Sequence, residues 1–87
     1  MNKTYTAKER AHLERVKSLQ CSVCDHPAPS DAHHIKQSNP YLCIALCKDC
    51  HQGVNGWHGN KSLWRIRKMD ELDCLCITLK RLFSEQV

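Results

Sequence analysis

The sequence has no long apolar run, no internal repeat and no low-complexity tract. Its apolar stretches are far shorter than the roughly 20 residues that cross a bilayer as a helix, so we expect no membrane partner. Its first residues show no basic start, apolar run and small-residue cleavage site, the pattern of a signal peptide. We therefore expect a reducing compartment, the cytoplasm.

The chain is also short of residues from which to build a core. Its 87 residues predict a single domain, 1–87, that buries too little apolar surface to be comfortably stable on its core alone. The seven cysteines are the candidate source of the additional stability, through cross-links or metal binding. An odd number cannot all pair as disulfides, and paired cysteines in a reducing compartment indicate metal ligands.

Neither sign of charge dominates strongly. The sequence has 13 Lys and Arg against 9 Asp and Glu, a formal charge of +4. Four zinc-bound thiolates would add minus four plus two and leave about +2, and a second divalent ion held by histidines would restore about +4. A mildly basic balance permits contact with nucleic acid without requiring it.

The pattern of caps, breakers and apolar residues predicts a small α+β domain. The elements expected in chain order are a helix over 7–20 behind a Thr6–Glu9 capping box, a cysteine knuckle over 21–30, strands over 32–35 and 41–46, a short helix from Lys48, a helix from Asn60 to about Met69, and a last helix capped by Asp70. The domain then divides into an N-terminal helix (1–20), a core (21–61) and C-terminal helices (62–87).

Two helices of this plan differ in their apolar content. The helix over 7–20 has few apolar positions, chiefly Leu13 and Val16, so we expect it to pack thinly and to dock on a partner. The last helix repeats apolar residues at helical spacing, which predicts a face directed into the core. Those residues are Leu72, Leu75, Cys76, Leu79, Leu82 and Phe83.

Four of the cysteines form two CxxC pairs. Cys21 and Cys24 make the first, Cys47 and Cys50 the second, and 22 residues (25–46) separate the pairs. A two-residue gap lets both sulfurs of a pair reach one ion, and two pairs complete a tetrahedron around zinc. A knuckle followed by a pair at a helix start predicts a treble clef. The main alternative, a redox dithiol, normally opens a helix in a βαβ unit, and none is predicted here.

Three cysteines lie outside these pairs. Cys74 and Cys76 are expected to be small core residues of the last helix. Cys43 falls on the second strand and is the residue that could substitute for a ligand. Structural zinc contributes roughly 10–16 kcal/mol in small finger peptides, more than the stability of many domains. We therefore expect chelation to unfold the protein.

Four of the six histidines fall near the predicted zinc scaffold. His33 and His34 are adjacent on the first strand, His51 follows the last cysteine of the pairs, and His58 follows a glycine-rich turn. A treble clef packs its hairpin against the helix of the second pair, which would set His33 and His34 opposite His51, within reach of one divalent ion. Of the other two, His12 is expected to be a surface residue. His26 is expected to fill space in the knuckle rather than to bind a metal.

Two segments carry a family resemblance. Residues 31–35 (DAHHI) and 46–51 (LCKDCH) resemble the HNH, or ββα-metal, nucleases whose site is braced by a CxxC…CxxC zinc. Residues 51–61 (HQGVNGWHGNK) look more specifically like phage recombination-enhancement (Ref-type) nucleases, in which a CH-x-G segment leads to a terminal HG. The resemblance covers roughly residues 21–61. It implies a zinc-stabilised ββα-metal core and a bacterial or phage-infected cell.

By position, the resemblance implies a role for each histidine. His34 matches the general base that deprotonates the attacking water, and a histidine suits this because its pKa lies near neutrality. His33 matches a ligand of the catalytic divalent metal, expected to be Mg²⁺, Mn²⁺ or Zn²⁺. His51 and His58 match the histidines that complete the ligand set. Neighbouring strand residues point to opposite faces, so His33 and His34 should divide the two roles.

One stretch departs from the pattern of this family. Many of its members place an asparagine just ahead of the second cysteine pair, where it orients the base, and residues 41–46 (YLCIAL) contain none. Asn39 and Asn55 are nearby in the sequence but do not occupy the position of the family's asparagine. Tyr41 or a backbone carbonyl would have to take the orienting role.

The segment after the histidines suits nucleic acid. Lys61, Arg65 and Lys68 fall at i, i+4 and i+7 and predict one basic helical stripe for phosphates. Trp57 is the candidate for stacking on an unpaired base, and Trp64 is expected in the core. The implied partners are double- or single-stranded DNA and, through the Ref-type resemblance, a RecA-like recombinase filament that presents the DNA.

Three classes of function stay open at this point. The first is a metal-dependent DNA endonuclease of the HNH type, associated with phage recombination. The second is a non-catalytic treble-clef zinc module that binds DNA or a recombination protein, and the missing asparagine favours it. The third is a zinc domain for protein interaction, which would have no need of the histidines.

Overall fold

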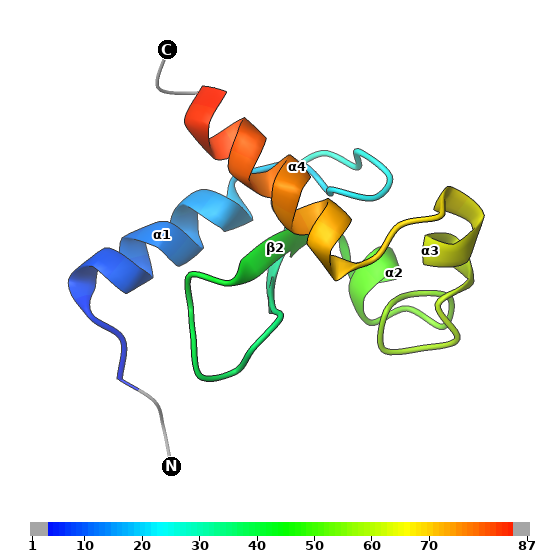
Figure 1. The fold of residues 1–87 in the computed structure, drawn as a ribbon, viewed down its shortest axis with the longest axis horizontal. Coiled ribbons are helices and arrows are strands. Elements are labelled where there is room, and N and C mark those ends of the chain that lie inside the picture. The colour runs from blue at the N-terminus through cyan, green and yellow to red at the C-terminus, as the bar shows by residue number, and fades with distance from the viewer. Residues whose placement is uncertain (1–3, 85–87) are drawn as a thin grey trace.

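A two-stranded antiparallel hairpin lies at the centre of the computed structural model, which describes residues 4–84. Strand β1 (Asp31–His34) pairs with β2 (Cys43–Leu46) so that Ala32 faces Ala45. Helix α1 lies on one side of the hairpin, α2 and α3 lie on the other, and α4 crosses it (Figure 1). Every residue of β2 is buried, because helices cover both of its faces.

The hairpin separates two hydrophobic clusters. Successive strand residues point to opposite faces, so Ile44 and Leu46 join one cluster while Cys43 and Ala45 join the other. The larger cluster also contains four cysteines and Trp64, and Trp64 is buried as expected. Its members are Cys21, Val23, Ile44, Leu46, Cys47, Cys50, Trp64 and Cys74. The smaller contains Leu13, Val16, Leu19, Cys43, Ala45 and Leu82.

Helix α1 (Ala7–Lys17) begins at the capping box that the sequence predicts, with reciprocal bonds between Thr6 and Glu9. It ends three residues before the predicted Gln20, where the Ser18 hydroxyl bonds the carbonyl of Arg15. Only Leu13 and Val16 of this helix are buried, so it packs through few residues, as expected. Both lie in the smaller cluster, against β2 and α4, and docking of the helix on a partner stays a prediction.

Three further helices complete the α+β fold, in the predicted order. They are α2 (Lys48–His51), α3 (Ser62–Arg67) and α4 (Glu71–Ser84). Asp70 and Asp73 exchange bonds at the start of α4, so the predicted cap is present. No helix within residues 4–84 is long and apolar enough to cross a membrane.

Helix α3 is shorter than the helix predicted to run to Met69. Lys68 adopts a left-handed conformation (φ 55°), its N–H bonds Arg65 O, and the N–H of Met69 bonds Trp64 O. This pair of bonds is the Schellman motif that ends helices, here with lysine in the position usually held by glycine. At the other end, the Asn60 side chain accepts a bond from the N–H of Ser62.

The buried face of α4 differs from the face that its apolar residues predict. Cys74, Thr78 and Leu82 are buried. Leu72 and Phe83 are exposed, and Cys76 is also exposed, so its assignment to the core is wrong. The helix therefore turns a partly polar face to the hairpin.

A hydrogen bond between Thr78 and β2 explains why α4 turns this face to the hairpin. The register places Ala45 at a position where its N–H and C=O point away from β1. The Thr78 hydroxyl accepts from the Ala45 N–H (3.4 Å), and Ser22 N–H donates to Ala45 O (2.9 Å). The Ser22 and Thr78 hydroxyls also bond each other at 2.9 Å. Thr78 thus provides a hydrogen-bond partner for the backbone N–H on the buried outer edge of β2.

We predict that Thr78→Val lowers the free energy of unfolding by about 1–3 kcal/mol, because it leaves the Ala45 N–H and the Ser22 hydroxyl buried without that partner. Thr78→Ser keeps the hydroxyl and should lose less. Thermal unfolding of the zinc-loaded variants measures both. A Thr78→Val protein as stable as the wild type would contradict this role.

Candidate metal centres

Two groups of side chains among residues 4–84 are arranged to hold a metal ion. In the first, the sulfur atoms of Cys21, Cys24, Cys47 and Cys50 all lie within 4.8 Å of one another. Zn–S bonds of about 2.3 Å in a tetrahedron place neighbouring sulfurs about 3.8 Å apart. The Cys24 and Cys47 sulfurs are 3.6 Å apart. The group therefore fits an ion such as zinc.

Local backbone bonds place these sulfurs. In the knuckle, the N–H of Asp25 bonds Cys21 O, the N–H of Cys21 bonds His26 O, and Asp25 adopts a positive φ of 63°. In the second pair, Cys47 is the N-cap of α2 and its sulfur accepts from the N–H of Cys50 at 3.5 Å. Each CxxC pair is thus closed by a tight turn.

The electrostatics of this group favour a cation once its thiols are ionised. Burial raises the pKa of the Cys47 and Cys50 thiols. Burial also opposes ionisation of Cys21, but the backbone N–H groups of Cys24, Cys47 and Val23 outweigh it and lower the pKa of that thiol. Four thiolates this close would repel one another, so they ionise together only around a positive ion.

The other cysteines lie outside this group. Burial raises the pKa of Cys43 to about 11 and is the main cause that raises the pKa of Cys74 to about 12, so both are inert thiols of the core. Cys43 points into the smaller cluster, away from the four sulfurs, and does not substitute for a ligand. Cys76 is exposed on α4.

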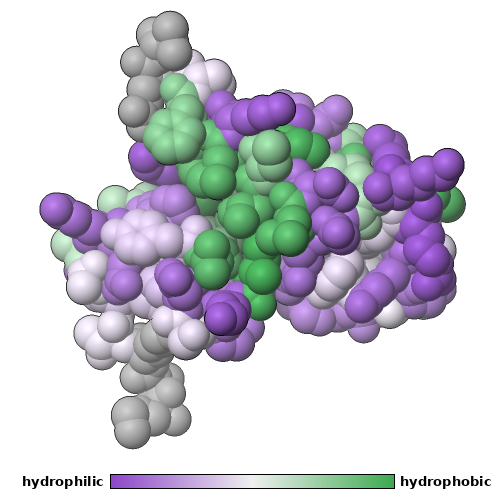
Figure 2. Space-filling model, viewed as in Figure 1, coloured by the Kyte–Doolittle hydropathy of each residue, from purple (hydrophilic) through white to green (hydrophobic). Residues whose placement is uncertain are grey.

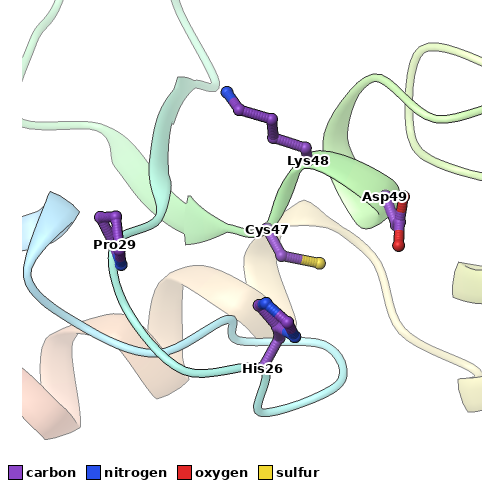
Figure 3. A pocket seen from close by; sticks show the side chains of 5 residues that line it. All are labelled: His26, Pro29, Cys47, Lys48 and Asp49. Atoms are coloured by element: carbon purple, nitrogen blue, oxygen red, sulfur yellow. The ribbon is translucent and has the colours of Figure 1, made fainter.

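A surface cavity of about 260 Å³ borders the sulfur group at Cys47. Figure 3 shows the His26 ring near the Cys47 side chain, with Lys48 extending away from both. His26 is exposed and lies outside the set of candidate ligands, in agreement with its assignment as a filler of the knuckle. The cavity is lined by His26, Pro29, Cys47, Lys48 and Asp49.

The second group is formed by three of the four predicted histidines. His33 from β1, His51 from the end of α2 and His58 from the following loop each place a ring nitrogen within 4.8 Å of the others. His33 and His51 are buried and His58 is exposed, so the group opens to solvent on one side. Their ring centroids lie 5.0–5.2 Å apart.

Two carboxylates set the tautomers of the buried pair. His33 Nε2 lies 2.6 Å from Glu71, and His51 Nδ1 lies 3.0 Å from Asp31. Ionised carboxylates only accept hydrogen bonds, so these two nitrogens carry the ring protons. Their inner nitrogens, His33 Nδ1 and His51 Nε2, then face each other with lone pairs at 3.2 Å.

Two facing lone pairs repel unless a positive charge lies between them. Burial lowers the pKa of His33, although the bond to Glu71 acts in the opposite sense, so burial disfavours a proton on the inner nitrogen of His33. Zinc–nitrogen bonds of 2.0–2.1 Å in a tetrahedron place neighbouring nitrogens about 3.3 Å apart. The observed 3.2 Å therefore fits a metal ion, and carboxylates on the outer nitrogens are the usual support of histidine ligands.

The glycine-rich loop after α2 returns His58 to His51. The N–H of Trp57 bonds Cys50 O at 2.8 Å, and the N–H of His58 bonds His51 O at 3.0 Å. A Cβ at Gly56 would lie 2.5 Å from Asp49 O, so no larger residue permits this approach. The glycines therefore allow the loop to approach α2 closely, in addition to ending that helix.

His34 is not brought into the histidine group, contrary to the expectation that it would lie opposite His51. It follows His33 on β1, so its side chain points to the opposite face of the hairpin. There its ring stacks on Tyr5, with centroids 6.3 Å apart. His12 is half-buried against Tyr41, so its assignment to the surface is wrong.

The predicted DNA-contact residues do not form one helical stripe. Only Arg65 lies within α3, because Lys61 and Lys68 flank that helix in left-handed conformations. The Lys61 ammonium lies 4.1 Å from the centre of the Trp57 ring. The same ring packs against Trp64 at 4.7 Å. Trp57 is therefore half-buried and partly occupied by contacts within the chain.

Comparison of the chain with protein-family models, curated proteins and solved structures found no match.

Sequence reasoning missed both carboxylates of the histidine group. Asp31 stands two residues before His33, and strand residues at i and i+2 share a face, so this signal was present. Glu71 lies 38 residues after His33 and belongs to another helix. No local pattern links those two.

We predict that Cys24→Ser loses most bound zinc and unfolds at a lower temperature, because a fourfold thiolate set loses one ligand. Cys76→Ser is the matched control, since Cys76 is exposed and outside the group. Metal analysis gives zinc per chain, and fluorescence follows Trp64, whose ring N–H bonds Cys50 O. Equal zinc content in the two variants would argue against the assignment.

We predict that Glu71→Gln weakens metal binding at the histidine group about 10–100-fold, the usual effect of losing a carboxylate behind a histidine ligand. Cobalt titration of zinc-loaded protein measures this through bands that lack sulfur-to-metal charge transfer. Glu14→Gln on the exposed face of α1 is the control. Unchanged cobalt affinity in Glu71→Gln would show that the carboxylate does not support a ligand.

Proposed function

We propose that the protein is a metal-dependent endonuclease of the HNH type, with structural zinc on the four cysteines and a divalent ion on His33, His51 and His58. The observation that supports this proposal most strongly is that the cysteine group offers four ligands whereas the histidine group offers three. Four-ligand cysteine sets are closed and structural, whereas three-ligand sets leave positions open for water and substrate. The exposed side at His58 is where a phosphodiester would enter.

Further features support this proposal. The cysteine knuckle, the hairpin and a helix that begins at the second pair follow one another as in a treble clef. Three imidazoles favour zinc, cobalt or nickel over magnesium and manganese, which prefer oxygen ligands. Bound there, such an ion would neutralise charge on the phosphate and promote deprotonation of the attacking water.

The residues around the ion have distinct tasks in the proposed reaction. Asp31 and Glu71 hold the two buried imidazoles in the tautomers that present lone pairs inward. They orient metal ligands, which differs from the role of the family's asparagine in orienting the base, and Tyr41 packs on His12. The resemblance gives the role of general base to His34, whose ring lies on the opposite face of the hairpin and stacks on Tyr5. The proposed reaction therefore depends on the ion at the three histidines to promote deprotonation of the water.

The substrate is proposed to be DNA. The chain carries a formal charge of +4, and Lys61, Arg65 and Lys68 lie in the segment just after His58. These residues are proposed to contact phosphates as separate cations around α3. If a recombinase filament has to present the DNA, naked DNA would be a poor substrate.

We expect zinc-loaded protein to nick supercoiled plasmid when manganese, cobalt, zinc or magnesium is added. His58→Ala should lower the rate by about 100-fold or more, because it removes a ligand of the ion that stabilises the transition state. It is the safest ligand variant, since His58 is exposed. His26→Ala, an exposed histidine outside the group, is the matched control.

Two further results decide the remaining roles. His34→Ala that nicks like the wild type would remove His34 from the reaction and leave the histidine group intact. A folded, zinc-loaded wild type that cleaves neither plasmid, single-stranded DNA nor filament-bound DNA would overturn the nuclease proposal. DNA binding without cleavage would then support the alternative, a non-catalytic zinc module that binds DNA or a recombination protein.

A further inference from the structure

Helix α4 carries a continuous apolar stripe on the face that it turns away from the hairpin. Leu72 is 67% exposed and Phe83 is 64% exposed, with Leu79 at 36% and Cys76 also exposed between them. These four residues, here called the α4 stripe, are spaced i, i+4, i+7 and i+11. Figure 2 shows an apolar band along this helix on the face toward the viewer.

The spacing of the α4 stripe is that of a helix–helix contact. Alternate steps of four and three residues keep side chains on one line along a helix, the arrangement that packs two helices side by side. The core already uses the other face of α4, at Cys74, Thr78 and Leu82. Among residues 4–84, the stripe is thus not needed for the packing of the fold.

The charges on α4 favour a second, antiparallel copy as the occupant. The helix begins with Asp70, Glu71 and Asp73 and carries Lys80 and Arg81 near its end. Asp73 and Lys80 are exposed, seven residues apart, and flank the stripe on the same side. An antiparallel twofold pair would place Asp73 of each chain beside Lys80 of the second copy, whereas a parallel twofold pair would place them on opposite sides of the contact.

The same arrangement is self-complementary in its apolar layers. Turning the stripe end for end places Leu72 against Phe83 of the second copy and Cys76 against Leu79, each contact made twice. A twofold interface uses the same patch on both chains, and this patch meets that condition.

We propose that two copies of this chain associate through antiparallel packing of the α4 stripe. The contact is one helix pair about 18 Å long, small beside the 1,200–2,000 Å² buried in stable interfaces. The dimer therefore dissociates on dilution. Its formation does not depend on metal at the histidine group or on nuclease activity.

The test is the mass of the zinc-loaded chain in solution, measured by sedimentation equilibrium from micromolar to millimolar concentration. A reducing agent is present so that an exposed Cys76 disulfide cannot imitate the dimer. The expected result is a rise in mass from one chain to two with increasing concentration. A mass of one chain at every concentration overturns the proposal.

Variants locate the contact. Leu79→Asp should remain monomeric at concentrations where the wild type is dimeric, while Ile66→Asp, an equally drastic change at an exposed residue of α3, should not. A dimer that survives Leu79→Asp overturns the assignment to the stripe. Far-UV circular dichroism and zinc content confirm that each variant is folded.

The antiparallel arrangement has its own test. Lys80→Glu should weaken the dimer at least several-fold at low salt, because it replaces two attractive pairs with two repulsive ones. The effect should shrink as salt is added. Equal dimerisation of Lys80→Glu and wild type at low salt overturns the antiparallel register.

Discussion

Four cysteine sulfurs packed within 4.8 Å of one another are the feature on which the rest of this structure depends. Three of the four cysteines are almost fully buried, and they make up a large share of the main hydrophobic cluster. A cation bound there would convert the mutual repulsion of the thiolates into attraction and would provide binding energy that a core of this size lacks. Ile44, Leu46 and Trp64 would then pack around a cross-link rather than forming a core by themselves.

Helix α2 couples the four cysteines to the histidine group. Its N-cap is Cys47, its third residue is Cys50 and its last residue is His51, so one helical turn contributes to both groups. The backbone carbonyls of Cys50 and His51 also bind the returning loop and place His58. Disturbance of the sulfur set should therefore reach the histidines through one short, rigid segment.

The hairpin and α4 divide the remaining tasks between their faces. On β1, His33 turns toward α2 and α4 while His34 turns toward Tyr5, so one strand serves two different environments. On α4, Thr78 completes the edge of β2 and Glu71 supports His33. The outward face of α4 is left apolar. In so small a domain, a single helix carries packing, positioning and surface contacts at once.

The sequence by itself determined the features that depend on neighbours along the chain. The CxxC spacing identified the four sulfurs, the Thr6–Glu9 and Asp70–Asp73 caps marked two helix starts, and the order of elements followed from local breakers. Tertiary structure alone decided which face of α4 is buried, that Glu71 reaches His33, and that His34 turns away from it. Those outcomes depend on a hydroxyl of α4 meeting the edge of β2 and on strand alternation within one particular register, and neither is encoded in the spacing of nearby residues.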